Sequence, residues 1–124
     1  MKSDLNDIRA FLHQALKNHL PTLQIRKEND SVMEVAGTIP ALQGKQQVDG
    51  YYFASVVPKP KDIRLYFFPI YTHPNDFEDL HPEVRKCLKG KSCFHIKKLD
   101  DAMEQAIVDM VQKGVDRYQR EGFI

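Results

Sequence analysis

The sequence predicts an α+β fold, in which an antiparallel β-sheet of about five strands packs against an N-terminal and a C-terminal helix. Near both ends of the chain, apolar residues recur three or four positions apart, as on the buried face of a helix. Between them, short runs rich in aromatic and β-branched residues are separated by turn-forming residues, as in neighbouring antiparallel strands. A chain of 124 residues with this succession of elements is expected to form a single domain, residues 1–124.

The first predicted helix covers Ser3–Leu20. Ser3 or Asp4 is available as its N-cap, and Pro21 cannot continue a helix. Its buried face is expected to consist of Leu5, Ile8, Phe11, Leu12, Ala15 and Leu16.

Two hairpins are predicted after this helix. The run "LQIRKENDSVMEVAG" alternates apolar and polar residues on both sides of Asn29 and Asp30, which favours two short strands joined by a tight turn. The next run, "TIPALQGKQQVDG", has little periodicity and predicts a connection that could form the rim of a cavity. The central hairpin is predicted from "YYFASVV" and "DIRLYFFPIY", and Pro69 in the second run indicates an edge strand or a bulge.

The last third of the chain predicts helix, strand and helix. A short helix is expected over Asp76–Lys89, which Pro82 would kink or break. In "SCFHIK", alternation places Phe94 and Ile96 in the core and leaves the other face of the strand to Cys93, His95 and Lys97.

The second long helix is predicted over Asp101–Glu121. Asp101 and Glu104 have the spacing of a capping box, and Gly122 is the expected helix terminator. Its buried face is expected to consist of Met103, Ala106, Ile107, Met110, Val111, Val115 and Tyr118.

Composition narrows the classes of function. Eighteen Lys and Arg against 17 Asp and Glu give a formal net charge of +1, which argues against a nucleic-acid partner. The chain lacks the long apolar run of a membrane span, and "MKSDLNDIR" is too charged to begin a secretory signal, so a cytoplasmic location is expected. Cys87 and Cys93 are expected to be free thiols, and the oligomeric state, monomer or homodimer, stays open.

Two stretches carry a family resemblance: "VDGYYFASV" followed by "DIRLYFF", and "KGKSCFHIKKLDDAMEQAIVDMVQKGVDRY". They form a pair of aromatic strands, then a Lys/Gly/Ser-rich approach to a short strand, then a C-terminal helix. In this succession the chain, from about Gly50 onward, resembles the YdhG-like family of small, mostly uncharacterised bacterial domains. The resemblance implies a frataxin-like α/β sandwich. It also implies an alternative function, because one branch of the family is described as an iron chaperone of frataxin type.

Five residues are candidates for binding a ligand. Hydroxyl groups on one face of the aromatic strands, those of Tyr52 and Tyr66, could line a small-molecule pocket, although core packing alone would also explain the aromatic residues. Lys91 follows Gly90 in a basic loop that could hold an anion or simply keep the surface polar. Cys93 and His95 share a strand face, where a thiolate and an imidazole could meet.

A second set, in "THPNDFEDLHPE", consists of potential metal ligands. His73, Asp76, Asp79 and His81 combine imidazoles and carboxylates, which iron, zinc and manganese accept. The alternative interpretation is a solvated helix entry with Asn75 or Asp76 as its cap.

No local pattern pairs a nucleophile with a base, so the expected function is non-enzymatic and needs no cofactor. The leading hypothesis is a YdhG-like binding or accessory domain for an unknown small molecule or protein. The alternatives are an iron or other metal chaperone, and a protein-interaction or nucleic-acid module based on the six basic residues between Arg85 and Lys98.

Overall fold

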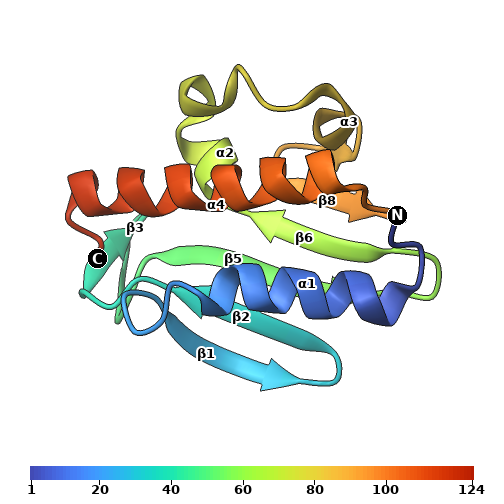
Figure 1. The fold of residues 1–124 in the computed structure, drawn as a ribbon. Helices are drawn as coiled ribbons and strands as arrows, with labels where there is room; N and C mark the ends of the chain where they lie inside the picture. Colours follow the sequence, from blue (N-terminus) through green and yellow to red (C-terminus); the bar gives the residue numbers. More distant parts are fainter.

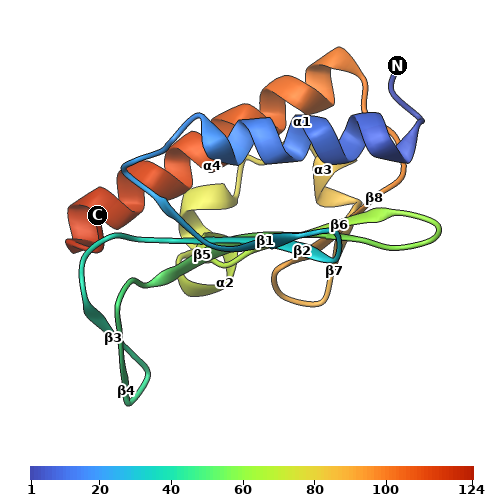
Figure 2. The same cartoon turned by 90° about the horizontal axis from the view of Figure 1, so that it is seen from below.

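The computed structural model describes residues 1–124 as a helix layer packed on a β-sheet (Figure 1). Helices α1 (Leu5–Lys17) and α4 (Asp101–Glu121) lie side by side on the same face of the sheet (Figure 2). We call the opposite face, which carries Glu34, Ser55, Tyr66 and Cys93, the open face. None of the helices is both long enough and apolar enough to span a bilayer.

The main sheet has six strands in the order β1-β2-β5-β6-β8-β7, and every neighbouring pair is antiparallel. A separate two-stranded hairpin, β3–β4, is inserted between β2 and β5. The strands are β1 (Gln24–Asn29), β2 (Val32–Ala36), β3 (Ala41–Gln43), β4 (Gln46–Val48), β5 (Tyr52–Pro58), β6 (Ile63–Phe67), β7 (Leu88–Lys89) and β8 (Cys93–Ile96). The predicted α+β class and the antiparallel sheet between two terminal helices are therefore confirmed.

The core lies between the sheet and the two long helices. Alternate residues of each strand are buried there, and on β8 these are Phe94 and Ile96, as predicted from the sequence. Tyr118 of α4 is fully buried, with its ring edge-on to that of Phe53 at a centroid distance of 5.1 Å. Aromatic contacts of this geometry add to the free energy gained from burial alone.

Both long helices begin on an aspartate. Asp4 caps α1 by accepting from the backbone N–H groups of Asn6 and Asp7 at 2.8 and 3.1 Å. The helix ends at Lys17, earlier than predicted, and the chain forms turns over residues 18–22.

The predicted capping box at the start of α4 is wrong. Asp100 is the N-cap and accepts from the N–H of Met103 at 2.8 Å, whereas Glu104 binds the Lys2 ammonium at 2.6 Å. Gly122 ends the helix in the left-handed region with φ of 80°, as expected of a helix terminator.

The segment between β6 and β8 differs most from the sequence prediction. Pro69 neither bulges a strand nor marks an edge: β6 is an internal strand that ends at Phe67, and Pro69 begins the short helix α2 (Pro69–Thr72). The single helix expected over 76–89 is also wrong. Two short elements, the 3₁₀-helix η1 (Pro74–Phe77) and α3 (Pro82–Arg85), stand in its place before β7.

Proline explains that break. The residue before a proline is pushed out of the helical region, and His81 is accordingly extended, with φ of −48° and ψ of 129°. Pro82 then occupies the first turn of α3, where its missing N–H costs nothing.

Candidate binding site on the open face of the sheet

A row of cross-strand neighbours crosses four strands of the open face. Glu34 pairs with Ser55, Ser55 with Tyr66, and Tyr66 with Cys93. These positions alternate along their strands with fully buried core residues, so their side chains point away from α1 and α4. Their hydroxyl, thiol and carboxylate groups make the open face chemically different from the apolar face beneath the helices.

The structure also places Tyr52 beside this row. Its hydroxyl oxygen lies 2.6 Å from Oγ of Ser55. Burial raises the pKa of Tyr52 to about 12, and the nearby Glu34 carboxylate acts in the same direction. The phenol therefore stays protonated at neutral pH, where it can both donate and accept a hydrogen bond.

A pocket of about 330 Å³ lies next to Tyr52, between the sheet and the β3–β4 hairpin. Figure 2 shows this hairpin projecting from the sheet on the side away from α1 and α4. We call it the hairpin pocket; its lining residues are Arg26, Glu34, Gln43, Gln46, Val48 and Tyr52. The connection predicted over "TIPALQGKQQVDG" thus contains a hairpin, and it does border a cavity.

Contacts at the base of the hairpin hold it over the open face. Oε1 of Gln43 accepts from the N–H of Tyr52 at 3.2 Å, and Nη1 of Arg26 donates to the carbonyl of Gly50 at 3.4 Å. Gly50 approaches Gly37 so closely that an added Cβ would lie 1.8 Å from the Gly37 carbonyl oxygen. Only glycine fits there, so Gly50 determines the point where the hairpin leaves the sheet.

A turn signal for this hairpin was present in the sequence. Gly44 and Lys45 join β3 to β4, and Gly44 has φ of 64°, which glycine adopts readily. A glycine at the first position of a two-residue turn is typical of β-hairpins. Apart from Tyr52, the polar residues of the hairpin pocket carried no such signal, because polar side chains on short strands also occur on any solvated surface.

The remaining candidate ligand-binding residues lie on or near the same face. His95 is the cross-strand neighbour of Arg64, and its Nδ1 lies 3.7 Å from Oδ2 of Asp62. Lys91 is separate from the row: it lies over the ring of Tyr71, with Nζ 5.6 Å from the centroid.

The thiol and imidazole of Cys93 and His95 do not form a hydrogen bond, although the two residues share a strand face. Burial raises the pKa of the Cys93 thiol, and the Tyr66 hydroxyl and the Arg64 guanidinium oppose that rise only in part. The thiol is therefore less reactive than a free cysteine, because the thiolate is the nucleophile.

The four predicted metal ligands are not gathered in the structure. Asp76 is bound by Arg117, Asp79 by Lys113 at 2.8 Å, and the imidazole of His81 accepts from the N–H of Glu83 at 3.1 Å. No group of three or more His, Cys, Asp and Glu side chains has an arrangement that could hold a metal ion. The metal-ligand hypothesis thus lacks a preformed site.

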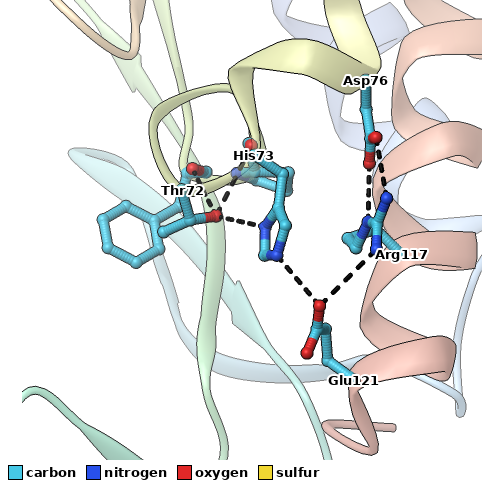
Figure 3. A network of polar contacts seen from close by, with 7 residues as sticks. Thr72, His73, Asp76, Arg117 and Glu121 are labelled. Atoms are coloured by element: carbon cyan, nitrogen blue, oxygen red, sulfur yellow. Dashed lines mark hydrogen bonds and ion pairs between the residues drawn. The ribbon is translucent and has the colours of Figure 1, made fainter.

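His73 belongs instead to a polar network with the end of α4, shown in Figure 3. Its Nδ1 lies 2.9 Å from the Thr72 hydroxyl and its Nε2 lies 3.1 Å from Oε1 of Glu121. Hydroxyl, imidazole and carboxylate in this order also occur in hydrolytic triads. Here the Glu121 carboxylate is shared with Arg117 at 3.6 Å, and none of the three main concavities is lined by these side chains. The network connects the α2–η1 segment to α4.

Comparisons of the chain with protein-family models, with curated proteins and with solved structures found no match. The function is therefore inferred from the geometry of the open face. The hairpin pocket is the place on that face where several different hydrogen-bonding groups surround a cavity.

Proposed function

We propose that the chain is a YdhG-like, cytoplasmic binding or accessory domain whose ligand, a small polar molecule, occupies the hairpin pocket. Support for the YdhG-like assignment comes from the order of elements, a helix, antiparallel strands and a final helix, which agrees with the frataxin-like sandwich that the resemblance implies. The two free thiols agree with a reducing compartment.

The observation that carries the proposal is the composition of the hairpin pocket wall. Arg26 offers donors, Glu34 offers acceptors, and the Tyr52 phenol stays protonated and offers both. The pocket volume of about 330 Å³ is at the small end of the range for small-molecule sites. These features fit a compact ligand that carries both donors and acceptors.

Gln43 and Gln46 complete the wall from the hairpin side, and their amides can turn to present either a donor or an acceptor. A ligand bound here would contact the sheet and the hairpin together. It would therefore stabilise the native state by an amount that grows with the logarithm of its concentration over its dissociation constant.

A thermal-shift screen of polar metabolites tests the proposal. We expect at least one chemical class to raise the melting temperature, and we expect Glu34→Gln and Gln46→Ala to weaken that effect. Gln47→Ala is the matched control, because Gln47 is the next residue on β4 and does not line the pocket. Hits that respond equally to Gln46→Ala and Gln47→Ala would contradict the proposed site.

A further inference from the structure

A second pocket, of about 340 Å³, lies where α3, β7, β8 and the start of α4 meet. It shares no residue with the hairpin pocket. We call it the lysine pocket; its lining residues are Asp62, Glu83, Lys86, Cys87, Lys89, His95, Lys97, Lys98 and Met103. Four of the six basic residues from Arg85 to Lys98 line this pocket.

Positive charge is in excess on this wall. Its four lysines face two carboxylates, a formal net charge of +2, whereas the whole chain carries only +1. The Lys86 ammonium is paired with Glu83 at 3.0 Å. Asp62 is already 3.2 Å from the Arg64 guanidinium and 3.7 Å from the His95 imidazole.

Three lysines of the lysine pocket have no ion-pair partner: Lys89, Lys97 and Lys98. Strand pairing brings two residues of the wall together, because the N–H of His95 donates to the carbonyl of Cys87 at 2.9 Å. The ammonium groups of Lys89 and Lys98 both lie close enough to Cys87 to oppose the rise that burial causes in the pKa of its thiol. Two of the three unpaired charges thus lie near Cys87 in the wall, and Lys97 lines the same hollow.

A concave surface with unpaired ammonium groups concentrates an anion more strongly than a flat surface with the same charge. Lysine is a common phosphate binder, because its ammonium group is a compact charge with three donors. The net charge of +2 on the wall matches the charge of a phosphate group at neutral pH. We propose that the lysine pocket binds the phosphate group of a small phosphorylated molecule.

Size and charge favour a small molecule over a nucleic acid. The pocket volume of about 340 Å³ accommodates a phosphorylated metabolite. A nucleic-acid groove would need basic residues that continue along the backbone of the ligand. Because the wall carries +2 and the whole chain +1, the residues outside the lysine pocket have a formal net charge of −1 and offer no general excess of positive charge.

Titration of the ¹⁵N-labelled chain with pyrophosphate and with glycerol 3-phosphate, followed by amide chemical shifts, tests the proposal. We expect shifts concentrated in residues 86–98 with both probes. The double variant Lys89→Gln, Lys98→Gln should weaken binding about tenfold or more, equivalent to about 1.4 kcal/mol. The matched control Lys27→Gln, Lys45→Gln removes the same charge from exposed, unpaired positions and should retain the affinity within about twofold.

Several outcomes would overturn the proposal. These are no binding of either probe, shifts spread evenly over the surface, or equal weakening in the two double variants. Tighter binding of a single-stranded oligonucleotide, with a steep dependence on salt, would reassign the cluster to nucleic acid. If the test double variant fails to fold, the single variant Lys97→Gln, at an exposed position, gives the same comparison.

Discussion

Arg117 of α4 binds Asp76 of η1 through two parallel contacts, from Nε to Oδ2 at 2.7 Å and from Nη2 to Oδ1 at 2.8 Å. The two residues lie 41 positions apart in the chain (Figure 3). Because a paired guanidinium and carboxylate favour one relative orientation, the contact fixes the 3₁₀ segment against the last third of α4.

Asp76→Asn should make stability less dependent on pH in acid. The hydrogen bonds from Arg117 lower the pKa of Asp76, so its folded-state pKa lies below the ordinary value of about 4. The pair therefore stabilises the fold above that ordinary value, and this contribution is lost as the pH falls through the lower, folded-state pKa. In urea unfolding, the variant should lose about 1 kcal/mol or less of unfolding free energy at pH 7. Its unfolding free energy should also change less as the pH falls into the acid range. An unchanged profile would contradict this role of the pair.

The double variant His73→Ala, Asp76→Asn should leave any binding of Fe²⁺ or Zn²⁺ unchanged. Arg117 and Lys113 hold the carboxylates of Asp76 and Asp79, so a metal ion would first have to displace a bound cation. Isothermal titration calorimetry on the wild-type chain and the double variant is the measurement. Submillimolar binding that disappears in the double variant would restore the metal-chaperone hypothesis.

His13 should make the fold less stable as the pH falls from 7 to 5. Burial lowers its pKa, the charge of Arg9 adds to this, and Nε2 is buried without a hydrogen-bond partner. The unfolded chain therefore binds a proton at a higher pH than the native state, so stability is lost below about pH 6.5. Replacing His13 with Leu should flatten this part of the curve in urea unfolding. The same slope in wild type and variant would contradict the prediction.

Gly114→Ala should destabilise the protein although alanine is the better helix former. An added Cβ would lie 2.7 Å from Cζ of Phe67 and 3.1 Å from Cζ of Phe53, and both rings are fully buried. Overpacking of this kind costs about 1 to 3 kcal/mol, more than the gain of about 1 kcal/mol in helix propensity. A raised urea midpoint would mean that the aromatic rings can move aside.

Phe94→Ala should cost about 3 to 5 kcal/mol, because the side chain is fully buried between the sheet and the helices. Lys97→Ala, at an exposed position just after β8, should change stability by less than about 0.5 kcal/mol. Denaturant midpoints compare the two variants directly. Equal effects would show that β8 is wrongly placed against the core.

Periodicity predicted the parts of the fold that alternate between core and solvent. The terminal helices and the aromatic strands have apolar positions at regular spacing, and so do Phe94 and Ile96. The helix expected over 76–89 does not form as one element, because Pro82 excludes its preceding residue from the helical region despite the helical spacing of the apolar residues. The β3–β4 hairpin was missed because its strands have only three residues each, too few to show a period.

The candidate site was predictable only in part for a similar reason. Alternation placed Cys93 and His95 on one face of β8, whereas only the strand register shows that Tyr66 of β6 lies on the same face. The contacts that shape the hairpin pocket, such as that between Arg26 and Gly50, join residues 24 positions apart. Pairings of this kind depend on the folded topology and leave no local pattern in the sequence.

The most direct test of the proposed function is to map the strongest thermal-shift hit on the ¹⁵N-labelled chain. We predict that saturating ligand shifts the amides of residues 41–50 and of the strand positions around Arg26, Glu34 and Tyr52, which surround the hairpin pocket. Shifts confined to residues 69–85 and α4, with the hairpin unchanged, would contradict the assignment of the open face as the binding face.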